Sequence, residues 1–129
     1  MIFPPVKFLK IKLMKFLSLE PFVPSGINFE GSKQLFQELG FGINWEAPGM
    51  VGFERDGCKF ILQNYANDNF AQNLMISVRI SNVSEFRTEM MNKKLIHKFG
   101  IRIGEITQQS YGKEMNVIDI AGVCWHFVE

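Results

Sequence analysis

Several residue types that mark common functional classes are scarce or missing in this sequence. There are only two cysteines, Cys58 and Cys124, with no CxxC pattern and no metal-type spacing, so we expect a reduced, cytoplasmic protein. No run of about 18 apolar residues occurs, which argues against a transmembrane helix. HExxH, GxSxG and glycine-rich phosphate-loop patterns are also missing. The formal net charge is +1, which is not typical of a nucleic-acid-binding domain.

The residues that are present favour one packed domain. The chain has 129 residues, and 47% of them are hydrophobic, enough for a single core. Thirteen phenylalanines stand against two tryptophans and two tyrosines. This choice of aromatic residues is typical of a packed or cavity-bearing interior rather than of a surface that stacks on bases.

Residues 1–15 form a basic leader that differs from the rest of the chain. They contain no acidic residue and four lysines, Lys7, Lys10, Lys12 and Lys15. The lysines interrupt any apolar core of a secretory signal, and Pro4 and Pro5 oppose a helix at the start. A short membrane-surface segment remains one interpretation. We favour an upstream extension, with Met14 rather than Met1 as the start.

Hydrophobic patterning divides residues 16–129 into two similar halves. In the first half we expect a strand at 16–23, a helix from Phe29 to Leu39 between Asn28 and Gly40, and strands at 41–47, 50–55 and 58–65. The last two strands flank Asp56-Gly57, a strong hairpin signal. Residues 66–72 are expected to be a polar connector.

The second half repeats this order. We expect a strand at 73–80, a helix after Ser81-Asn82, a strand in 98–106, and a hairpin of 115–120 and 123–128 around Ala121-Gly122. The sequence therefore predicts an α+β domain of two βαβββ modules, at about 16–65 and 73–128. One such unit cannot enclose a core alone, so we expect the two to pack together.

Three passages carry a resemblance to a known superfamily. They are FVPSGINFEGSKQLFQELGF (22–41), LMISVRISNVSEF (74–86) and YGKEMNVIDIAGVCWHFVE (111–129). In this order they resemble the first strand and helix, the start of the second module and the closing Asp-x-x-Gly strand of the vicinal-oxygen-chelate superfamily. That superfamily includes glyoxalase I, extradiol dioxygenases and bleomycin-resistance proteins. The resemblance covers roughly residues 16–129 and implies two modules whose curved sheets enclose a cleft.

The resemblance also implies where a metal would be held in the enzymes of the superfamily. Their four ligands correspond here to Leu19, a position near Ile61 that could be served by Gln63, Met75, and His126, four residues after Gly122. Alkyl and thioether groups are poor ligands for Ni, Zn, Fe or Mn, so we expect no metal and no other cofactor. The residues therefore favour a binding protein over an enzyme, and none of them is predicted to be catalytic.

Strand alternation sorts the side chains between a cleft and a core. If His126 faces the cleft, so does Cys124, while Trp125 and Phe127 face the core. The same rule places Met75, Ser77 and Arg79 in the cleft, with Lys59, Ile61 and Gln63 from the earlier strand. The predicted ligand-binding residues are His126, Arg79, Ser77, Gln63, Trp45, Met75, Leu19 and Tyr111.

Several of these residues have a second interpretation. His126 either contacts a ligand or is a neutral imidazole bonded to a backbone carbonyl. Arg79 either contacts a ligand or pairs with an acid such as Glu105, and Trp45 and Tyr111 line either the cleft or a subunit interface. Cys124 lies two residues from His126, a separation at which we expect no direct thiolate–imidazole hydrogen bond.

Three hypotheses about function follow. The first is metal-free sequestration of a small apolar or aromatic molecule, as in the bleomycin-resistance branch and its antibiotic-resistance proteins, by a homodimer with no nucleic-acid or membrane partner. The second is a metal-dependent lyase or dioxygenase with a reduced ligand set of His126, Gln63 and a group such as Glu46. The third is a catalytically silent interaction module, whose cleft would be filled by its own side chains.

Overall fold

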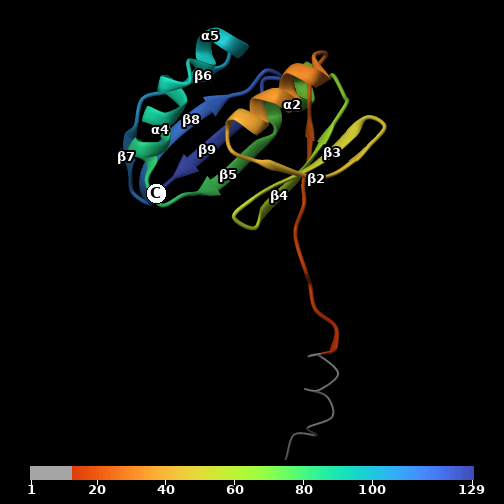
Figure 1. The fold of residues 1–129 in the computed structure, drawn as a ribbon. Coiled ribbons are helices and arrows are strands. Elements are labelled where there is room, and N and C mark those ends of the chain that lie inside the picture. Colours follow the sequence, from red (N-terminus) through yellow and green to blue (C-terminus); the bar gives the residue numbers. More distant parts are fainter. Residues whose placement is uncertain (1–12) are drawn as a thin grey trace, which may run out of the picture.

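The computed structural model describes residues 13–129, and the strands in that range form two sheets (Figure 1). The N-terminal sheet has the order β1 (Phe22–Pro24), β4 (Cys58–Gln63), β3 (Met50–Arg55) and β2 (Gly42–Ala47). The C-terminal sheet has the order β5 (Met75–Arg79), β9 (Cys124–Val128), β8 (Gly112–Ile118) and β6 (Arg102–Ile103), and β7 (Thr107–Gln109) also pairs with β8. In each sheet the first and last strands along the chain are parallel neighbours. The predicted α+β fold with two similarly ordered sheets is confirmed.

The main helices begin at asparagines, as the sequence predicts. Helix α2 (Phe29–Glu38) follows β1, and α4 (Val83–Asn92) and α5 (Leu95–Phe99) follow β5. The side chains of Asn28 and Asn82 each accept a hydrogen bond of 2.9 Å from a backbone N–H in the first turn. These bonds satisfy N–H groups that have no partner inside the helix. No helix of residues 13–129 is both long enough and apolar enough to cross a membrane.

One aromatic core joins the two halves. Phe36 of α2 lies with its ring centroid 4.8 Å from that of Phe60 in β4 and 5.3 Å from that of Trp125 in β9. All three side chains are buried. Such large aromatic contacts contribute much of the burial free energy of a small domain. Because these contacts connect residues of both halves, the two sheets share one core.

The two faces of each sheet divide as alternation predicts. In β4, Phe60 is buried and Lys59 and Ile61 are partly exposed; in β9, Trp125 is buried and His126 is partly exposed. The faces that carry the buried residues pack against the helices and one another. The opposite faces of both sheets are therefore open in a single chain.

The expected strand at 16–23 is shorter than predicted. Only Phe22–Pro24 forms β1, and residues 13–21 extend from the domain as an exposed arm (Figure 1). The parallel register pairs Phe22 with Ile61, and β4 begins only three residues earlier, at Cys58. Residues before Leu19 therefore have no strand to pair with, although their alternation suits a strand. Residues 1–12 of the basic leader lie outside the described residues.

The polar connector expected at 66–72 contains a helix instead. Helix α3 (Asp68–Asn73) is capped by Asn67, whose side chain accepts from the N–H of Phe70 at 2.9 Å. Ala71 is buried against the core. The polar composition conceals this helix because only one of its residues is fully buried.

Candidate functional site

The open face of the C-terminal sheet brings together five of the eight predicted site residues. They line a hollow of about 390 Å³ together with Glu114 and Val128, and are Met75, Ser77, Arg79, Tyr111 and His126. The parallel pairing of β5 and β9 places Ser77 opposite His126 and Met75 opposite Cys124. We call this surface the sheet hollow. It combines apolar side chains with a few hydrogen-bonding groups, as small-molecule sites do.

The other three predicted residues do not reach the sheet hollow in one chain. Trp45 and Gln63 lie on the N-terminal sheet, and Leu19 lies in the arm with 91% of its surface exposed. Placing Leu19 on a first strand was wrong, because β1 begins only at Phe22. Trp45 pairs across the strands with Gly52, and its indole occupies the space that a side chain at Gly52 would need.

Glu114 is the residue that the sequence analysis missed. It lies on β8, is only 8% exposed, and its Oε1 is 3.1 Å from Nδ1 of His126. Its other carboxylate oxygen accepts a hydrogen bond of 3.0 Å from the hydroxyl of Tyr111. The signal was available, because alternation with the buried Met115 and Val117 places Glu114 on the open face.

Cys124 contacts His126 directly, contrary to the expectation from their spacing. The thiol Sγ lies 3.3 Å from Nε2 of His126, while Nδ1 of the same ring faces Glu114. The backbone-bonded alternative for His126 is not what the structure shows, because both ring nitrogens contact side chains. Tyr111, Glu114, His126 and Cys124 thus form one hydrogen-bonded chain of titratable groups, which we call the Cys–His–Glu–Tyr chain.

The surroundings of the Cys–His–Glu–Tyr chain shift the pKa values of two of its members, Tyr111 and Cys124. The hydrogen bond to Glu114 raises the pKa of the Tyr111 hydroxyl, with smaller contributions from burial and the charge of Glu114. Burial raises the pKa of the Cys124 thiol, and the negative charges of Glu114 and Asp119 act in the same direction. The thiol is therefore protonated at neutral pH.

The residues at the superfamily's metal positions do not fit a metal. Leu19 and Met75 supply no oxygen or nitrogen donor, and both ring nitrogens of His126 are engaged by side chains. Glu46, a possible substitute, pairs with Lys33 at 2.5 Å on the other sheet. Within residues 13–129, no three His, Cys, Asp or Glu side chains are placed to share an ion. We therefore derive no chemistry through a metal.

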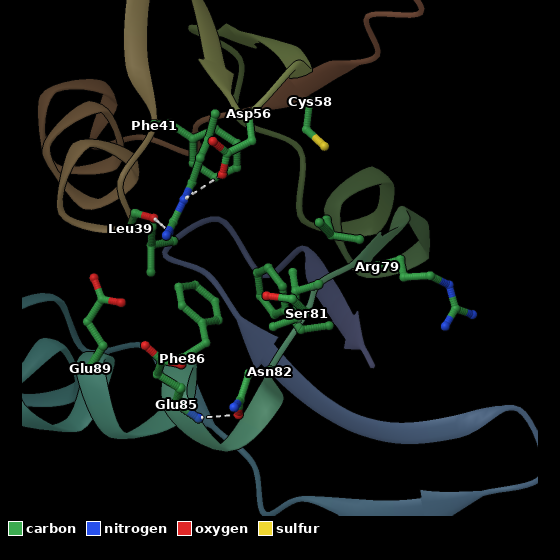
Figure 2. A pocket seen from close by; sticks show the side chains of 14 residues that line it. Leu39, Phe41, Asp56, Cys58, Arg79, Ser81, Asn82, Glu85, Phe86 and Glu89 are labelled. Carbon is green, nitrogen blue, oxygen red and sulfur yellow. Dashed lines mark hydrogen bonds and ion pairs between the residues drawn. The ribbon is translucent and has the colours of Figure 1, made fainter.

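A second hollow of about 400 Å³ lies between the two halves (Figure 2). Val78 and Phe127, from the core faces of β5 and β9, line it, so it lies on the opposite side of the sheet from the sheet hollow. Arg55 crosses it, donating to the carbonyl of Leu39 at 2.6 Å with its guanidinium 5.5 Å from the ring centre of Phe86. These contacts give Arg55 a role in joining the halves.

Arg79 is oriented away from this second hollow. Figure 2 shows its guanidinium extending away from the other lining residues, and Arg79 also borders the sheet hollow. Glu105, the acid suggested as its partner, pairs with Arg87 at 3.3 Å.

Comparison with solved structures identifies the fold. A bleomycin-binding protein of Streptomyces verticillus, complexed with copper(II)-bleomycin, matches with a TM-score of 0.72 and 18% identity over 89% of this chain and 97% of that one. A bleomycin-resistance determinant encoded on transposon Tn5 matches with a TM-score of 0.73 and 20% identity over 87% and 96%. The chain has the vicinal-oxygen-chelate fold.

This fold is shared with enzymes as well as with binding proteins. A lactoylglutathione lyase of Agrobacterium tumefaciens matches with a TM-score of 0.65 and 10% identity, over 90% of this chain and 96% of that one. No protein-family model matches the sequence, and no curated protein does. These matches establish the vicinal-oxygen-chelate fold.

Proposed function

We propose that this chain is a metal-free binding protein that sequesters a small apolar or aromatic molecule in the sheet hollow. The observation that carries the proposal is the composition of that open face. Met75 is 67% exposed there and Val128 also lines the hollow, while Ser77 and Arg79 supply donors. Apolar area with sparse, oriented polar groups favours a small organic ligand. The solved structures of bleomycin-binding proteins with this fold support the same function.

A second copy of the chain would complete the site. On the open face of the N-terminal sheet, register places Phe22, Ile61 and Trp45 in one row, with Gly52 between the last two. Phe22 is 53% exposed and Trp45 39%. A contiguous exposed apolar row of this kind marks an interaction surface. In a homodimer this row, with Gln63, would cover the sheet hollow of the partner.

The arm supports dimerisation independently. Phe16, Leu17 and Leu19 are each about nine-tenths exposed, at 94%, 89% and 91%. Three large apolar side chains in water are unfavourable, and their burial on a second copy would release about 1.5 to 3 kcal/mol for each side chain. We expect the arm to extend along the partner and to bring Leu19 to the cleft there.

The test is a thermal-shift screen of aromatic and cationic compounds against the full chain. A compound at about 100 times its dissociation constant stabilises the fold by about 2.7 kcal/mol. Met75→Glu places a charge in the sheet hollow and should abolish the shift. Met91→Glu is the matched control, because Met91 is also exposed, at 41%, but lies on α4. Light scattering on the same samples measures the dimer.

Three results would count against the proposal. Equal shifts for Met75→Glu and Met91→Glu would place the ligand elsewhere. Stoichiometric bound Ni, Zn, Mn or Fe that is lost in His126→Ala would favour a metal-dependent lyase or dioxygenase. No shift from any compound, with side chains closing the hollow in the dimer, would favour a silent interaction module.

A further inference from the structure

We propose that Cys124 is a nucleophile, with His126 as its general base and Glu114 orienting the base, and that the site captures α,β-unsaturated carbonyl compounds as thioether adducts. The inference extends the proposed function, since the thiol lies on the same open face as the sheet hollow. It adds a covalent step that reversible sequestration does not require.

The geometry is that of a nucleophile, a base and an orienting acid. Sγ of Cys124 is 3.3 Å from Nε2 of His126, and Nδ1 is 3.1 Å from the carboxylate of Glu114. Sulfur hydrogen bonds are longer than those of oxygen, so the first distance is a direct contact. A nucleophile in contact with a base, which is held in turn by a third group, is the general signature of activated nucleophiles.

The partners of His126 define how its ring is used. The Glu114 carboxylate accepts only, so Nδ1 carries the proton and donates to it, and Nε2 is left as an acceptor for the thiol proton. Because Glu114 is nearly buried and also accepts from Tyr111, its orientation is constrained from a second direction. The ionisable groups around the ring are Glu114 and Tyr111 from β8 and the turn before it, Cys124 from β9, and Arg79 from β5.

The resting thiol needs such a base. Burial and the charges of Glu114 and Asp119 raise the pKa of Cys124, so few thiolates form spontaneously at neutral pH. Transfer of the proton to Nε2 produces an imidazolium next to the Glu114 carboxylate, where the charge is compensated. Cys58 offers an internal contrast, because it is exposed and its sulfur makes no hydrogen bond with the described part of the chain.

The addition balances without a cofactor. Sγ attacks the β-carbon of the unsaturated carbonyl compound and forms a carbon–sulfur bond as the thiol proton moves to Nε2 of His126. The electron pair of the carbon–carbon double bond moves toward the carbonyl and gives an enolate. His126 then returns its proton to the α-carbon. The net change is addition of S–H across the double bond, with no leaving group, oxidant or reductant.

The experiment compares the two cysteines of the full-length protein by their rates of labelling with N-ethylmaleimide, an unsaturated dicarbonyl compound. Intact-mass spectrometry follows Cys124 in a Cys58→Ser background and Cys58 in a Cys124→Ser background. Adding His126→Gln should slow Cys124 by about tenfold or more at neutral pH, as expected for loss of a general base. Adding Glu114→Gln should slow it less. Neither change should alter the labelling of Cys58.

The pH profile distinguishes activation from simple exposure and needs no substitution within the Cys–His–Glu–Tyr chain. The Cys124 rate in the Cys58→Ser protein should level off between about pH 7 and about pH 8, where an imidazole is largely neutral and can accept the thiol proton. A rate that rises about tenfold per pH unit across this range, as for an unassisted thiol of raised pKa, would overturn the proposal. So would equal Cys124 rates with and without His126→Gln.

The proposals of a covalent step and of reversible binding can be tested independently. The Cys58→Ser/Cys124→Ser protein cannot form the adduct, so its thermal shift measures reversible binding alone. If a compound binds reversibly but His126 does not accelerate the labelling of Cys124, only the proposal that Cys124 is an activated nucleophile is overturned. Assisted labelling without any reversible thermal shift would overturn only the sequestration function.

Discussion

The hairpins that end the two sheets both turn on an aspartate and a glycine, and they use the aspartate differently. Asp56 is exposed and adopts a left-handed conformation, with φ of 50°. Asp119 is 6% exposed and accepts from the N–H groups of Ala121, Gly122 and Val123 at 3.0 to 3.1 Å. It also accepts from the indole N–H of Trp125 at 2.9 Å. The first aspartate supports a backbone conformation, and the second organises a turn from inside.

The open faces of the two sheets also differ, because one is mainly apolar and the other carries linked polar groups. The N-terminal sheet presents the apolar row of Phe22, Ile61 and Trp45, whereas the C-terminal sheet presents the Cys–His–Glu–Tyr chain. Strand order is similar in the two sheets, so topology does not determine this difference. The side chains at alternate positions of β8 and β9 determine it.

The largest predicted effect separates the two aspartates. Asp119→Ala should lower the free energy of unfolding by about 3 kcal/mol or more, because it leaves several buried donors without an acceptor. Asp56→Ala should cost only about 0.5 to 1 kcal/mol, because the exposed aspartate already carries most of the strain of the left-handed conformation. Urea denaturation of the full chain measures both. Similar losses for the two variants would contradict the distinction between the turns.

Alanine substitutions of the two turn glycines should have similar effects on stability. Gly57 and Gly122 have φ of 83° and 100°, and a Cβ at either would meet nothing closer than 3.9 Å. Alanine at each position should therefore cost about 1 to 2 kcal/mol through backbone strain alone. The same denaturation experiment checks this. A loss at Gly122 as large as that at Asp119 would show that the turn, and not the aspartate, is the sensitive element.

The smallest predicted effect concerns Tyr111 and should leave stability almost unchanged. Its hydrogen bond to Glu114 raises the pKa of the hydroxyl, since ionisation would place two negative charges together. Glu114→Gln should lower that pKa toward the ordinary tyrosine value. Ultraviolet absorbance of the phenolate, measured in a Tyr65→Phe background, follows Tyr111 alone. An unchanged titration midpoint would exclude the hydrogen bond in solution.

Much of the fold follows from local patterns in the sequence. The cap at Asn28, the helix start after Asn82, the turns at Gly57 and Gly122, and the alternation of β4 and β9 involve residues close in the chain. The structure agrees with each of these predictions. The predicted binding roles of Trp45, Gln63 and the residues of the sheet hollow stay predictions. Helix α3 was not predicted because its sequence is polar. Residues 16–21 were wrongly predicted as part of a strand, because their alternation does not reveal whether a neighbouring strand exists.

Alternation along each strand separates the residues of its two faces, and this can be predicted from the sequence because it is a property of a single strand. Which open-face residues meet depends on how the strands pair and on the conformations of their side chains. Glu114 reaches His126 because the register of β8 and β9 brings two strands together, and Cys124 reaches the same ring through side-chain conformation. Hydrogen bonds require atoms to lie within a few tenths of an ångström of their preferred separation, and sequence spacing does not fix distances to that precision.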